Sequence, residues 1–402
     1  MSTRIAFTTN FVAPYRLGFF TALAGTPGWE FKLFSSCHTE FDRQWKPLHD
    51  FPFAHKRSFS FSYIRRVRHQ GRFGFLDRKQ VNIPLGLLLD LYHFRPDTIV
   101  STEFGAGTFI SAVYALIMRR RLVVWFYGTP HSERDISWKQ RLLRKILTRM
   151  ADAFVGMGTE ARQYLLSLGL PSMAIFDAPN ATGLLGFQSR LQEQERISIR
   201  RRLDMKGLCF LYVGQINERK GVGSLLGVWQ AFCAQTGVDA SLILVGDGPD
   251  RVRFENRFDS SIKFLGHTDP ERLPAIFQAA DIFVFPTLED VWGLVVNEAL
   301  TSGLPVICSR WAGCAADLII EDKNGWVVNP ENPQDFLEAL KKAWDAWERK
   351  EEMSRAARET AAELTIARMT SGFQKAVEFA FSKPQSTFEP IRVTDRVNVD
   401  PS

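Results

Sequence analysis

Short runs of β-branched and aromatic residues alternate with helical patterns along most of this chain, and this rhythm limits the folds it can adopt. In the first half, strands are predicted at RIAFTTN, WEFKLFSS, TIVST, LVVWFYG, AFVGMG and MAIFDAP. Helices are predicted between several of them, at residues 17–24, 84–93, 107–119 and 137–150. Strands that alternate with helices indicate βαβ units and a mostly parallel sheet. The chain is therefore expected to have an α/β fold.

A polar, charged stretch interrupts this alternation near the middle of the chain, which indicates two domains. After it the strand-like runs LCFLYVG, SLILVGDG, IKFLG, IFVFPT, PVICS and WVVNP follow. A length of 402 residues also exceeds the usual size of one hydrophobic core. We predict Rossmann-like domains at residues 1–190 and 206–365, joined by a linker at 191–205 and facing each other across a cleft. Residues 366–381 are predicted to form a helix that packs back on the N-terminal domain, and 382–402 a disordered tail.

The composition is that of an ordinary globular protein, with 45% hydrophobic and 23% charged residues. The net charge of +6 suits a phosphate-bearing substrate, nucleic acid or an acidic membrane without selecting among them. The five cysteines are dispersed, which is typical of reduced thiols rather than disulfides or a zinc site. We find no signal sequence, and no apolar run approaches the roughly 20 residues of a membrane span. We expect a cytoplasmic protein, with peripheral contact to the inner face of the membrane as a further expectation.

Two loops in the second half follow predicted strands, where a doubly wound sheet binds its ligand. In LYVGQINERKG, Lys220 stands at the start of a helix, where its charge and the free backbone N–H groups favour a phosphate. In LILVGDGPD, Gly246 permits close approach of the backbone to a ligand. Taken alone, the first loop is better interpreted as a turn with an exposed lysine, and the second as an ordinary βα turn.

The strongest segment is IFVFPTLEDVWGLVVNEALTSGLPVI, residues 282–307. A buried strand leads through an acidic loop into a helix that begins near Gly293 and ends at Gly303. The backbone N–H groups of residues 293–295 are expected to point into the cleft as an anion site. Glu298 and Asp290 can accept hydrogen bonds from sugar hydroxyls. Taken alone, Glu298 can be explained as a solvated helix residue and Asp290 as an N-cap. The presence of both carboxylates beside Gly293 favours a binding site. The next segment, 309–330, is interpreted as scaffold.

In this order, these segments resemble the retaining glycosyltransferases of the GT-B fold, specifically family 4. The matching stretches run from residue 211 to 336: the VG-x5-KG loop, VGDGP, AADIFVFPT, the acidic loop with WGLVVNEA, SGLPVI and NGWVV. NFVAPYRLGFF, GTPHSE and APNA extend a looser resemblance into the N-terminal half. The resemblance implies two Rossmann-like domains, a nucleotide-sugar donor, and a reaction that needs no metal and no other cofactor.

The resemblance also implies roles for individual residues. Lys220 would bind the donor diphosphate, Glu298 the ribose, and Asp290 or the adjacent Glu289 the donor sugar. His131 matches a histidine that hydrogen-bonds the donor sugar in some relatives, and a surface residue or cap is its alternative. The predicted catalytic residues are therefore His131, Lys220, Asp290 and Glu298.

The chain departs from the family pattern at two positions of the predicted donor site. Gln215 stands where an arginine is usual, and Asp290 where a glutamate is usual. We hypothesise that Arg219 replaces the missing positive charge. The whole predicted donor site comprises Gly214, Gln215, Arg219, Lys220, Gly246, His267, Glu289, Asp290, Gly293, Leu294, Val295 and Glu298.

The acceptor is expected on the N-terminal domain, with Tyr15 and Arg16 as candidate contacts. Residues 51–80 lack clear periodicity and are predicted to be an irregular excursion from the sheet. Their mixture of basic and aromatic residues suits a membrane surface that bears a lipid-linked sugar. In the predicted helix WKQRLLRKILTRM, the apolar stripe of Leu142, Leu143, Ile146 and Leu147 is interpreted as facing the core, with a solvated basic face.

The expected activity is retaining transfer of a sugar from a nucleotide-sugar, UDP- rather than GDP-linked, to a lipid-linked or polysaccharide acceptor. Such a reaction belongs to surface polysaccharide biosynthesis. The alternatives are a nucleotide-sugar epimerase or a phosphorylase on the same fold, an inactive nucleotide-sugar binder, and a nucleic-acid-binding protein. WGLVVNEA argues against the epimerase, and no helix-turn-helix, aromatic RNP pattern or zinc knuckle supports nucleic-acid binding. The departures at Gln215 and Asp290 keep the inactive binder open.

Overall fold

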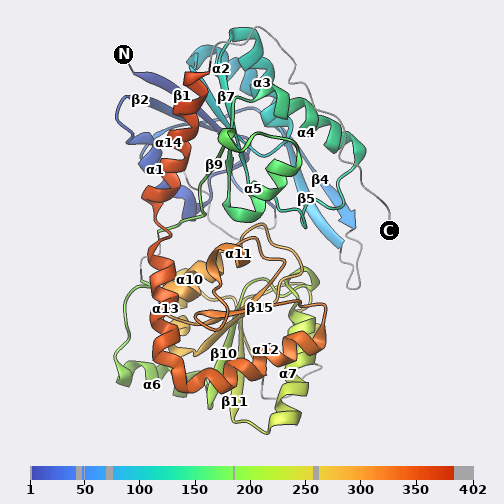
Figure 1. Cartoon of the computed structure of the whole chain (residues 1–402), viewed down its shortest axis with the longest axis vertical. Helices are drawn as coiled ribbons and strands as arrows, with labels where there is room; N and C mark the ends of the chain where they lie inside the picture. Colours follow the sequence, from blue (N-terminus) through green and yellow to red (C-terminus); the bar gives the residue numbers. More distant parts are fainter. Residues whose placement is uncertain are drawn as a thin grey trace.

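The computed structural model describes residues 2–41, 48, 50–68, 76–183, 186–256 and 262–383. These residues form two α/β domains that lie one above the other in Figure 1, each built on a parallel sheet. The predicted α/β class with two Rossmann-like domains is thereby confirmed. All five cysteines lie in the described part of the chain and carry free thiols.

The N-terminal domain is built on a seven-stranded sheet with the order β3-β2-β1-β6-β7-β8-β9, in which every neighbouring pair is parallel. Its inner strands are almost entirely buried because helices cover both faces, so they read as continuous apolar runs. The strands are β1 (Thr3–Thr9), β2 (Trp29–Ser35), β3 (Ala54–Arg57), β6 (Thr98–Thr102), β7 (Arg121–Phe126), β8 (Ala153–Gly156) and β9 (Ile175–Asp177). The helices are α1 (Leu17–Ala24), α2 (Leu87–Phe94), α3 (Ala106–Met118), α4 (Trp138–Met150) and α5 (Gly158–Ser167).

The C-terminal domain has a six-stranded parallel sheet with the order β12-β11-β10-β13-β14-β15. The chain reverses direction across the sheet between β10 and β13, and ligands of doubly wound folds bind outside the strand ends at such a point. The strands are β10 (Leu208–Val213), β11 (Ala240–Val245), β12 (Ile262–Gly266), β13 (Ile282–Phe285), β14 (Val306–Ser309) and β15 (Gly325–Val328). The helices are α7 (Val222–Thr236), α8 (Arg251–Glu255), α9 (Leu273–Ala279), α10 (Leu294–Ser302), α11 (Ala315–Leu318), α12 (Pro333–Asp345) and α13 (Lys350–Ala362).

The last helix, α14 (Ile366–Ser382), returns to the N-terminal domain and lies along its sheet in Figure 1. Phe373 packs against Trp125 and Phe19, with ring centroids 5.2 and 4.9 Å away. Residues 384–402, which contain most of the predicted tail, lie outside the described residues.

The stretch predicted as a linker is a helix of the second domain, α6 (Glu193–Arg202). Arg196 and Arg200 both form ion pairs with the buried Asp281 at the start of β13, with N–O distances of 2.5 and 2.9 Å. These ion pairs fix α6 to the C-terminal sheet. The polar sequence is therefore the solvent-facing surface of a packed helix rather than a flexible connection.

The segment predicted as irregular contains regular structure. Strand β3 joins the edge of the main sheet, while β4 (Phe61–Arg68) and β5 (Leu76–Ile83) pair as an antiparallel hairpin. Residues 61–66 are exposed on both faces of β4, so this strand has no alternation of buried and exposed positions to detect. Residues 69–75, between the two strands, lie outside the described residues.

Candidate functional site

The carboxyl ends of β10, β11 and β13 bring several loops of the C-terminal domain into close contact. Gly246, after β11, has a φ of +133°, and a Cβ there would lie 1.9 Å from the carbonyl oxygen of Gly214. The two loops after β10 and β11 therefore touch through their backbones, which only glycine permits at this position. The structure brings the predicted Gly214 and Gly246 together at this edge of the sheet.

Helix α10 starts at the same edge. Its N-cap, Gly293, has a φ of +100°, and a Cβ there would lie 2.6 Å from the Phe285 ring. The first N–H groups of a helix have no carbonyl one turn before them, so those of Leu294 and Val295 are available to a ligand. With the helix dipole, they form a site suited to an anion.

Lys220 lies beside this helix start. Its ammonium is 5.5 Å from the centre of the same Phe285 ring and 2.5 Å from Oδ2 of Asp290. Asp290 also accepts a hydrogen bond from the backbone N–H of Trp292 (3.1 Å). Burial alone would raise the pKa of Asp290, but the charges of Lys220 and Arg219 outweigh it and hold this pKa below its usual value. An ionised Asp290 thus holds the Lys220 ammonium by an ion pair.

Glu298 lies one turn into α10, and its environment differs from that of Asp290. Burial raises the pKa of Glu298 to about 7, and no charged group offsets this effect. Among the residues that the structure describes, no hydrogen bond or ion pair engages its carboxyl group. A half-buried carboxyl without a partner, beside free N–H donors, has the capacity to bind ligand hydroxyls.

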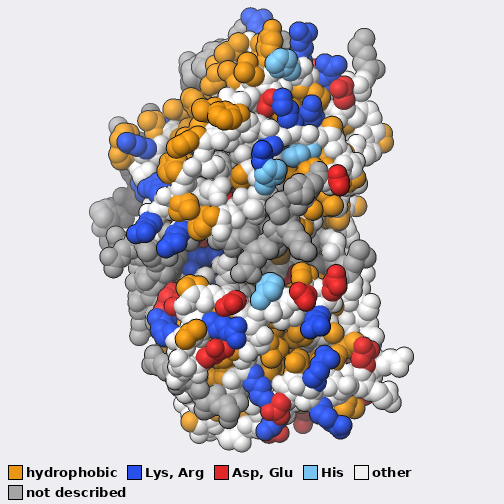
Figure 2. Space-filling model, turned by 180° about the vertical axis from the view of Figure 1, so that it is seen from behind, with side chains coloured by type: hydrophobic (Ala, Val, Ile, Leu, Met, Phe, Trp, Pro, Cys, Tyr) orange, Lys and Arg blue, Asp and Glu red, His pale blue; other side chains and the backbone are white. Residues whose placement is uncertain are grey.

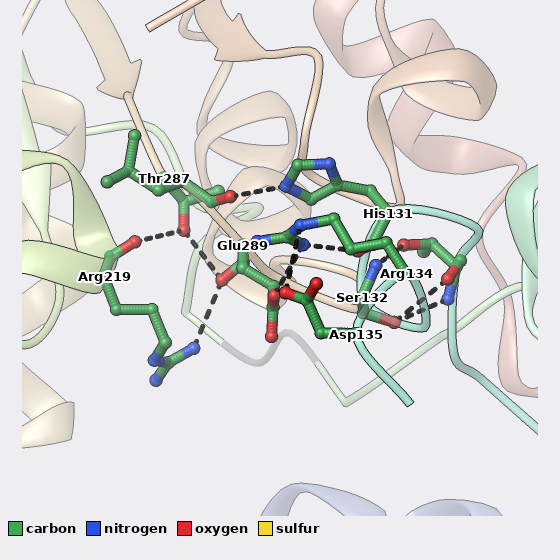
Figure 3. Close-up of polar contacts among 9 residues, drawn as sticks. His131, Ser132, Arg134, Asp135, Arg219, Thr287 and Glu289 are labelled. Atoms are coloured by element: carbon green, nitrogen blue, oxygen red, sulfur yellow. Dashed lines mark hydrogen bonds and ion pairs between the residues drawn. The ribbon is translucent and has the colours of Figure 1, made fainter. Parts of the chain in front are cut away.

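A group of residues from both domains meets across the cleft (Figure 3). Nε2 of His131 donates to the carbonyl oxygen of Leu288 (2.9 Å), and its ring stacks on Trp311 at 3.9 Å. Arg134 forms an ion pair with the buried Glu289 (2.9 Å) and donates to the carbonyl oxygen of His131. The acidic loop is therefore held from the N-terminal side through Glu289 and from the C-terminal side through Asp290.

Further contacts fix the two domains against each other. Asp317 of α11 accepts hydrogen bonds from the backbone N–H (3.0 Å) and hydroxyl (2.7 Å) of Thr159, at the start of α5. The Asn297 amide donates to the carbonyl oxygen of Asn180 (2.8 Å) and accepts from Trp292 (3.0 Å). Asn297 lies on α10 next to Glu298, so the helix that carries the candidate site also contacts the other domain.

The remaining predicted donor residues have distinct placements. Arg219 donates to the carbonyl oxygen of Glu289 (3.2 Å), so its guanidinium lies at the acidic loop. The side chain of Gln215 accepts a long hydrogen bond from Asn217 (3.3 Å) within its own loop. His267 follows the edge strand β12 and is exposed, and no hydrogen bond joins it to the other site residues in the described part of the chain. Of these three, Arg219 is the one that the structure joins to the acidic loop.

The two predicted acceptor residues lie at the carboxyl end of β1. Tyr15 is partly exposed, whereas the Arg16 guanidinium is packed over the Trp125 ring at 4.4 Å and between the sulfur atoms of Met157 and Met369. Burial lowers the pKa of Arg16. Helix α14 supplies Met369, so the last helix helps to position this arginine.

Sequence reasoning missed several residues that the structure places at the cleft. Arg134 and Trp311 are among them, and Trp311 belongs to the segment interpreted as scaffold. Glu103, directly after β6, was also missed: it lines a cavity within the N-terminal domain, its φ is +62°, and burial raises its pKa to about 8. An acidic residue immediately after the buried run TIVST was the signal that could have identified Glu103.

Residues 193–360 match the family model of glycosyl transferases group 1. The match covers the part of the C-terminal domain that carries the glycine loops, Lys220 and the acidic pair. The matched range begins at α6, in agreement with its packing on the second domain.

Relatives and solved structures support the same family. Sulfoquinovosyl transferase of Arabidopsis thaliana is 33% identical over 295 residues, which cover 69% of this chain and 56% of that protein. O-antigen chain mannosyltransferase B of Escherichia coli is 33% identical over 106 residues, covering 25% and 28% of the two chains. The Anabaena protein HepE in complex with UDP superposes with a TM-score of 0.68 at 15% identity, over 94% of this chain and all of that one. The last match shows the GT-B fold for both domains. The chain spans little more than half the length of the first relative.

Two further properties of the described residues bear on membrane and metal binding. No helix among them has the length and apolar character to cross a bilayer. No cluster of three or more histidine, cysteine, aspartate or glutamate side chains suited to a metal ion occurs among them.

Proposed function

We propose that this protein is a retaining glycosyltransferase that moves a sugar from a nucleotide-sugar, UDP- rather than GDP-linked, to a lipid-linked or polysaccharide acceptor. The single observation that carries the proposal is the unpartnered, half-buried Glu298 one turn from the free N–H groups of α10. A nucleoside diphosphate has ribose hydroxyls for the first and phosphate oxygens for the second. The bound UDP of the Anabaena protein supports the choice of base.

Lys220 and the start of α10 would neutralise the leaving diphosphate, and no metal ion would be required. The Lys220 ammonium and the N-cap Gly293 both lie near the Phe285 ring, so the cation is on the same side of the sheet as the start of α10. Negative charge develops on the leaving phosphate as its bond to the donor sugar breaks. Hydrogen-bond donors and cations fixed at this phosphate lower the activation barrier most. Arg219, which lies at the acidic loop, would add positive charge that Gln215 does not supply.

The retaining reaction is written as attack from the face that the diphosphate leaves. The bond between the anomeric carbon and the phosphate oxygen breaks, and its electron pair stays on the phosphate. The acceptor oxygen bonds to the anomeric carbon, and its proton passes to the leaving phosphate. Asp290 or Glu289 would hold the sugar hydroxyls. His131, fixed by Trp311 and the Leu288 carbonyl, would face the donor sugar from the N-terminal domain.

A lipid-linked acceptor requires contact with a membrane, and α4 presents a suitable face. The interpretation of its apolar stripe as core-facing is wrong for half of the stripe: Leu142 and Ile146 are 50% and 40% exposed, together with Trp138 at 69%. Lys145 and other basic residues of the helix lie among them. Figure 2 shows hydrophobic side chains interspersed with Lys and Arg over the rear face of the N-terminal domain. Apolar side chains set among basic ones suit an anionic lipid surface.

Nucleotide binding tests the donor assignment. We expect UDP to raise the midpoint of thermal unfolding more than GDP or ADP does, in the presence of EDTA. Glu298→Gln should lose this stabilisation, whereas Glu338→Gln, an exposed α12 control in the same domain, should keep it. Equal stabilisation by all nucleotides, or a requirement for a divalent cation, would refute the donor or the metal-free part of the proposal. Sugar transfer that is undetectable despite UDP binding would favour the inactive binder.

Membrane contact has its own test. We expect co-sedimentation with vesicles that contain phosphatidylglycerol, and weaker co-sedimentation with pure phosphatidylcholine. Leu142→Glu should reduce binding, while Val252→Glu, at an exposed apolar position on α8 of the other domain, should not. Binding that ignores both lipid charge and Leu142 would exclude this face.

A further inference from the structure

The N-terminal domain contains a cavity of about 160 Å³ at the carboxyl ends of β1, β2 and β6, and its lining includes hydroxyl, amide and carboxyl side chains. Residues 80–82 of β5 and the start of α3 also line it. A cavity of roughly 150 Å³ is known to hold one benzene molecule, so a space of this volume admits a ligand of about one ring.

The cavity has an unsatisfied donor in its wall. Asn82 is only 6% exposed, and its Oδ1 accepts hydrogen bonds from Ser62 (2.6 Å) and Gln80 (2.9 Å). Its Nδ2, which is also buried, makes no hydrogen bond within the described residues. The Cys37 thiol lies close to this amide, which lowers the thiol pKa, but burial is the largest effect and raises that pKa to about 11. A buried amide donor without an acceptor is costly unless a ligand or water fills the site.

The floor offers further hydrogen-bonding groups in fixed positions. Thr8 donates to Ser101 (2.7 Å), and Ser101 is bonded to Thr108 (2.8 Å), so a chain of hydroxyls runs beneath the cavity. Ala106 and Gly107 line the cavity in the first turn of α3, where N–H groups have no intrahelical acceptor. Hydroxyl side chains and free helix N–H groups are thus both present in the lining.

The charge of the lining selects the class of ligand. None of the described residues that line the cavity is lysine or arginine, whereas Glu103 is among them. Burial, and then Glu133, raise the pKa of Glu103 to about 8, so the carboxyl is mainly uncharged near neutral pH and able to donate a hydrogen bond. A phosphate or carboxylate would find no countercharge from a side chain here.

The cavity is connected to the proposed reaction centre. Glu103 Oε1 accepts a hydrogen bond from the backbone N–H of Tyr127 (3.3 Å), and Tyr127 begins the loop that carries His131. The carboxyl edge of the N-terminal sheet, where the cavity lies, is also the edge from which His131 and Arg134 reach the second domain. A ligand in the cavity would lie on the acceptor side of the cleft.

We infer that this cavity binds one uncharged sugar ring of the acceptor, and that the Asn82 amide and the Glu103 carboxyl recognise its hydroxyls. The identification of this sugar as part of the acceptor rests on the proposed function. The binding of a neutral sugar in the cavity does not require turnover. It assigns specificity to the β4–β5 hairpin, because β5 supplies Asn82 and Gln80. It also predicts discrimination against sugars that carry a phosphate on the ring bound here.

Saturation-transfer NMR with simple sugars tests the inference. The probes are methyl α-glucoside, methyl α-galactoside and methyl α-mannoside, with glucose 6-phosphate as the charged comparison, all in the presence of saturating UDP. We expect at least one neutral glycoside to show transfer while UDP is bound, and glucose 6-phosphate to show less. Asn82→Asp, which keeps the shape but replaces the free donor with an acceptor, should weaken binding about tenfold.

A second pair of variants guards against a folding defect. A Cβ at Gly105, on the cavity rim, would meet no atom within 4 Å, so Gly105→Leu can fill the cavity without backbone strain. It should abolish the neutral-sugar signal, whereas Gly227→Leu, at an equally open position on α7, should leave it unchanged. The absence of signal from all three glycosides, a preference for glucose 6-phosphate, or unchanged binding in Gly105→Leu overturns the inference. Neutral-sugar binding in a chain that does not bind UDP would refute the proposed function and leave the cavity assignment standing.

Discussion

The raised pKa of Glu298 leads to a quantitative prediction about the free energy of unfolding. Its pKa of about 7 in the folded chain exceeds the ordinary value of 4.5 because burial favours the protonated form. That difference corresponds to about 3 kcal/mol of folding free energy, since each pH unit is worth about 1.36 kcal/mol. The folded state retains its proton between these two pH values while the unfolded state loses it. Stability therefore falls as pH rises from about 4.5 to 7.

Glu298→Gln removes this dependence, because the amide keeps the shape and does not titrate. The variant and the wild type should have similar free energies of unfolding near pH 4.5. Above pH 7 the variant should be more stable, by up to about 3 kcal/mol and by less if water reaches the half-buried carboxyl. Urea denaturation from pH 4.5 to 8.5 measures the difference. Parallel curves for the two proteins would refute the description of Glu298 as a buried carboxyl without a partner.

Binding of UDP should lower the raised pKa of Glu298. If ribose hydroxyls donate to Glu298, they favour the ionised form and lower its pKa towards the ordinary value. About half a proton would then be released per UDP bound at pH 7, since the free carboxyl is about half protonated there. Calorimetric titrations in buffers of different ionisation enthalpy measure this number. The phosphate of UDP also exchanges protons, so the quantity of interest is the difference between wild type and Glu298→Gln. Equal proton release by the two proteins would show that the ribose does not bind there.

Substitutions at Lys220, Gly293 and Trp311 test the surrounding site. Lys220→Met removes the ammonium that pairs with Asp290 and should lower the free energy of unfolding by about 3 kcal/mol. The double variant that also carries Asp290→Asn should recover most of this loss. Additive losses in urea denaturation would contradict the ion pair. Gly293→Ala places a side chain at a left-handed position against Phe285 and should lower the free energy of unfolding by about 1–3 kcal/mol. It should also weaken UDP binding. Unchanged UDP affinity by calorimetry would disprove the anion site at α10. Trp311→Ala should lower turnover about tenfold or more, because the His131 ring loses its stacking partner. Trp311→Phe retains a stacking ring and should keep most of the activity. Equal losses in the two variants would contradict the role of Trp311 in orienting His131.

The sequence was informative where the chain is regular and buried. Parallel strands covered on both faces, such as β7 and β10, appear as uninterrupted apolar runs, so the α/β class and the two halves followed from the pattern. The start of α10 followed from its glycine, as the observed φ of Gly293 explains. The sequence was misleading where elements face solvent: the polar helix α6 resembled a linker, and β4 lacked alternation.

The cleft contacts could not be predicted, because they join residues that are far apart in the sequence. The Arg134–Glu289 pair spans 155 positions, and the Thr159–Asp317 contacts span 158. No local pattern marks such pairs, since the relative position of two domains depends on side-chain contacts along the whole interface. Trp311 was classed as scaffold for this reason, although the structure stacks it on His131.

A crystal structure with UDP tests the central claim most directly. We predict ribose hydroxyls within hydrogen-bonding distance of Glu298, and diphosphate oxygens at the backbone N–H groups of Leu294 and Val295 and at the Lys220 ammonium. UDP bound elsewhere, or with its ribose away from Glu298, would contradict the assignment of the donor site.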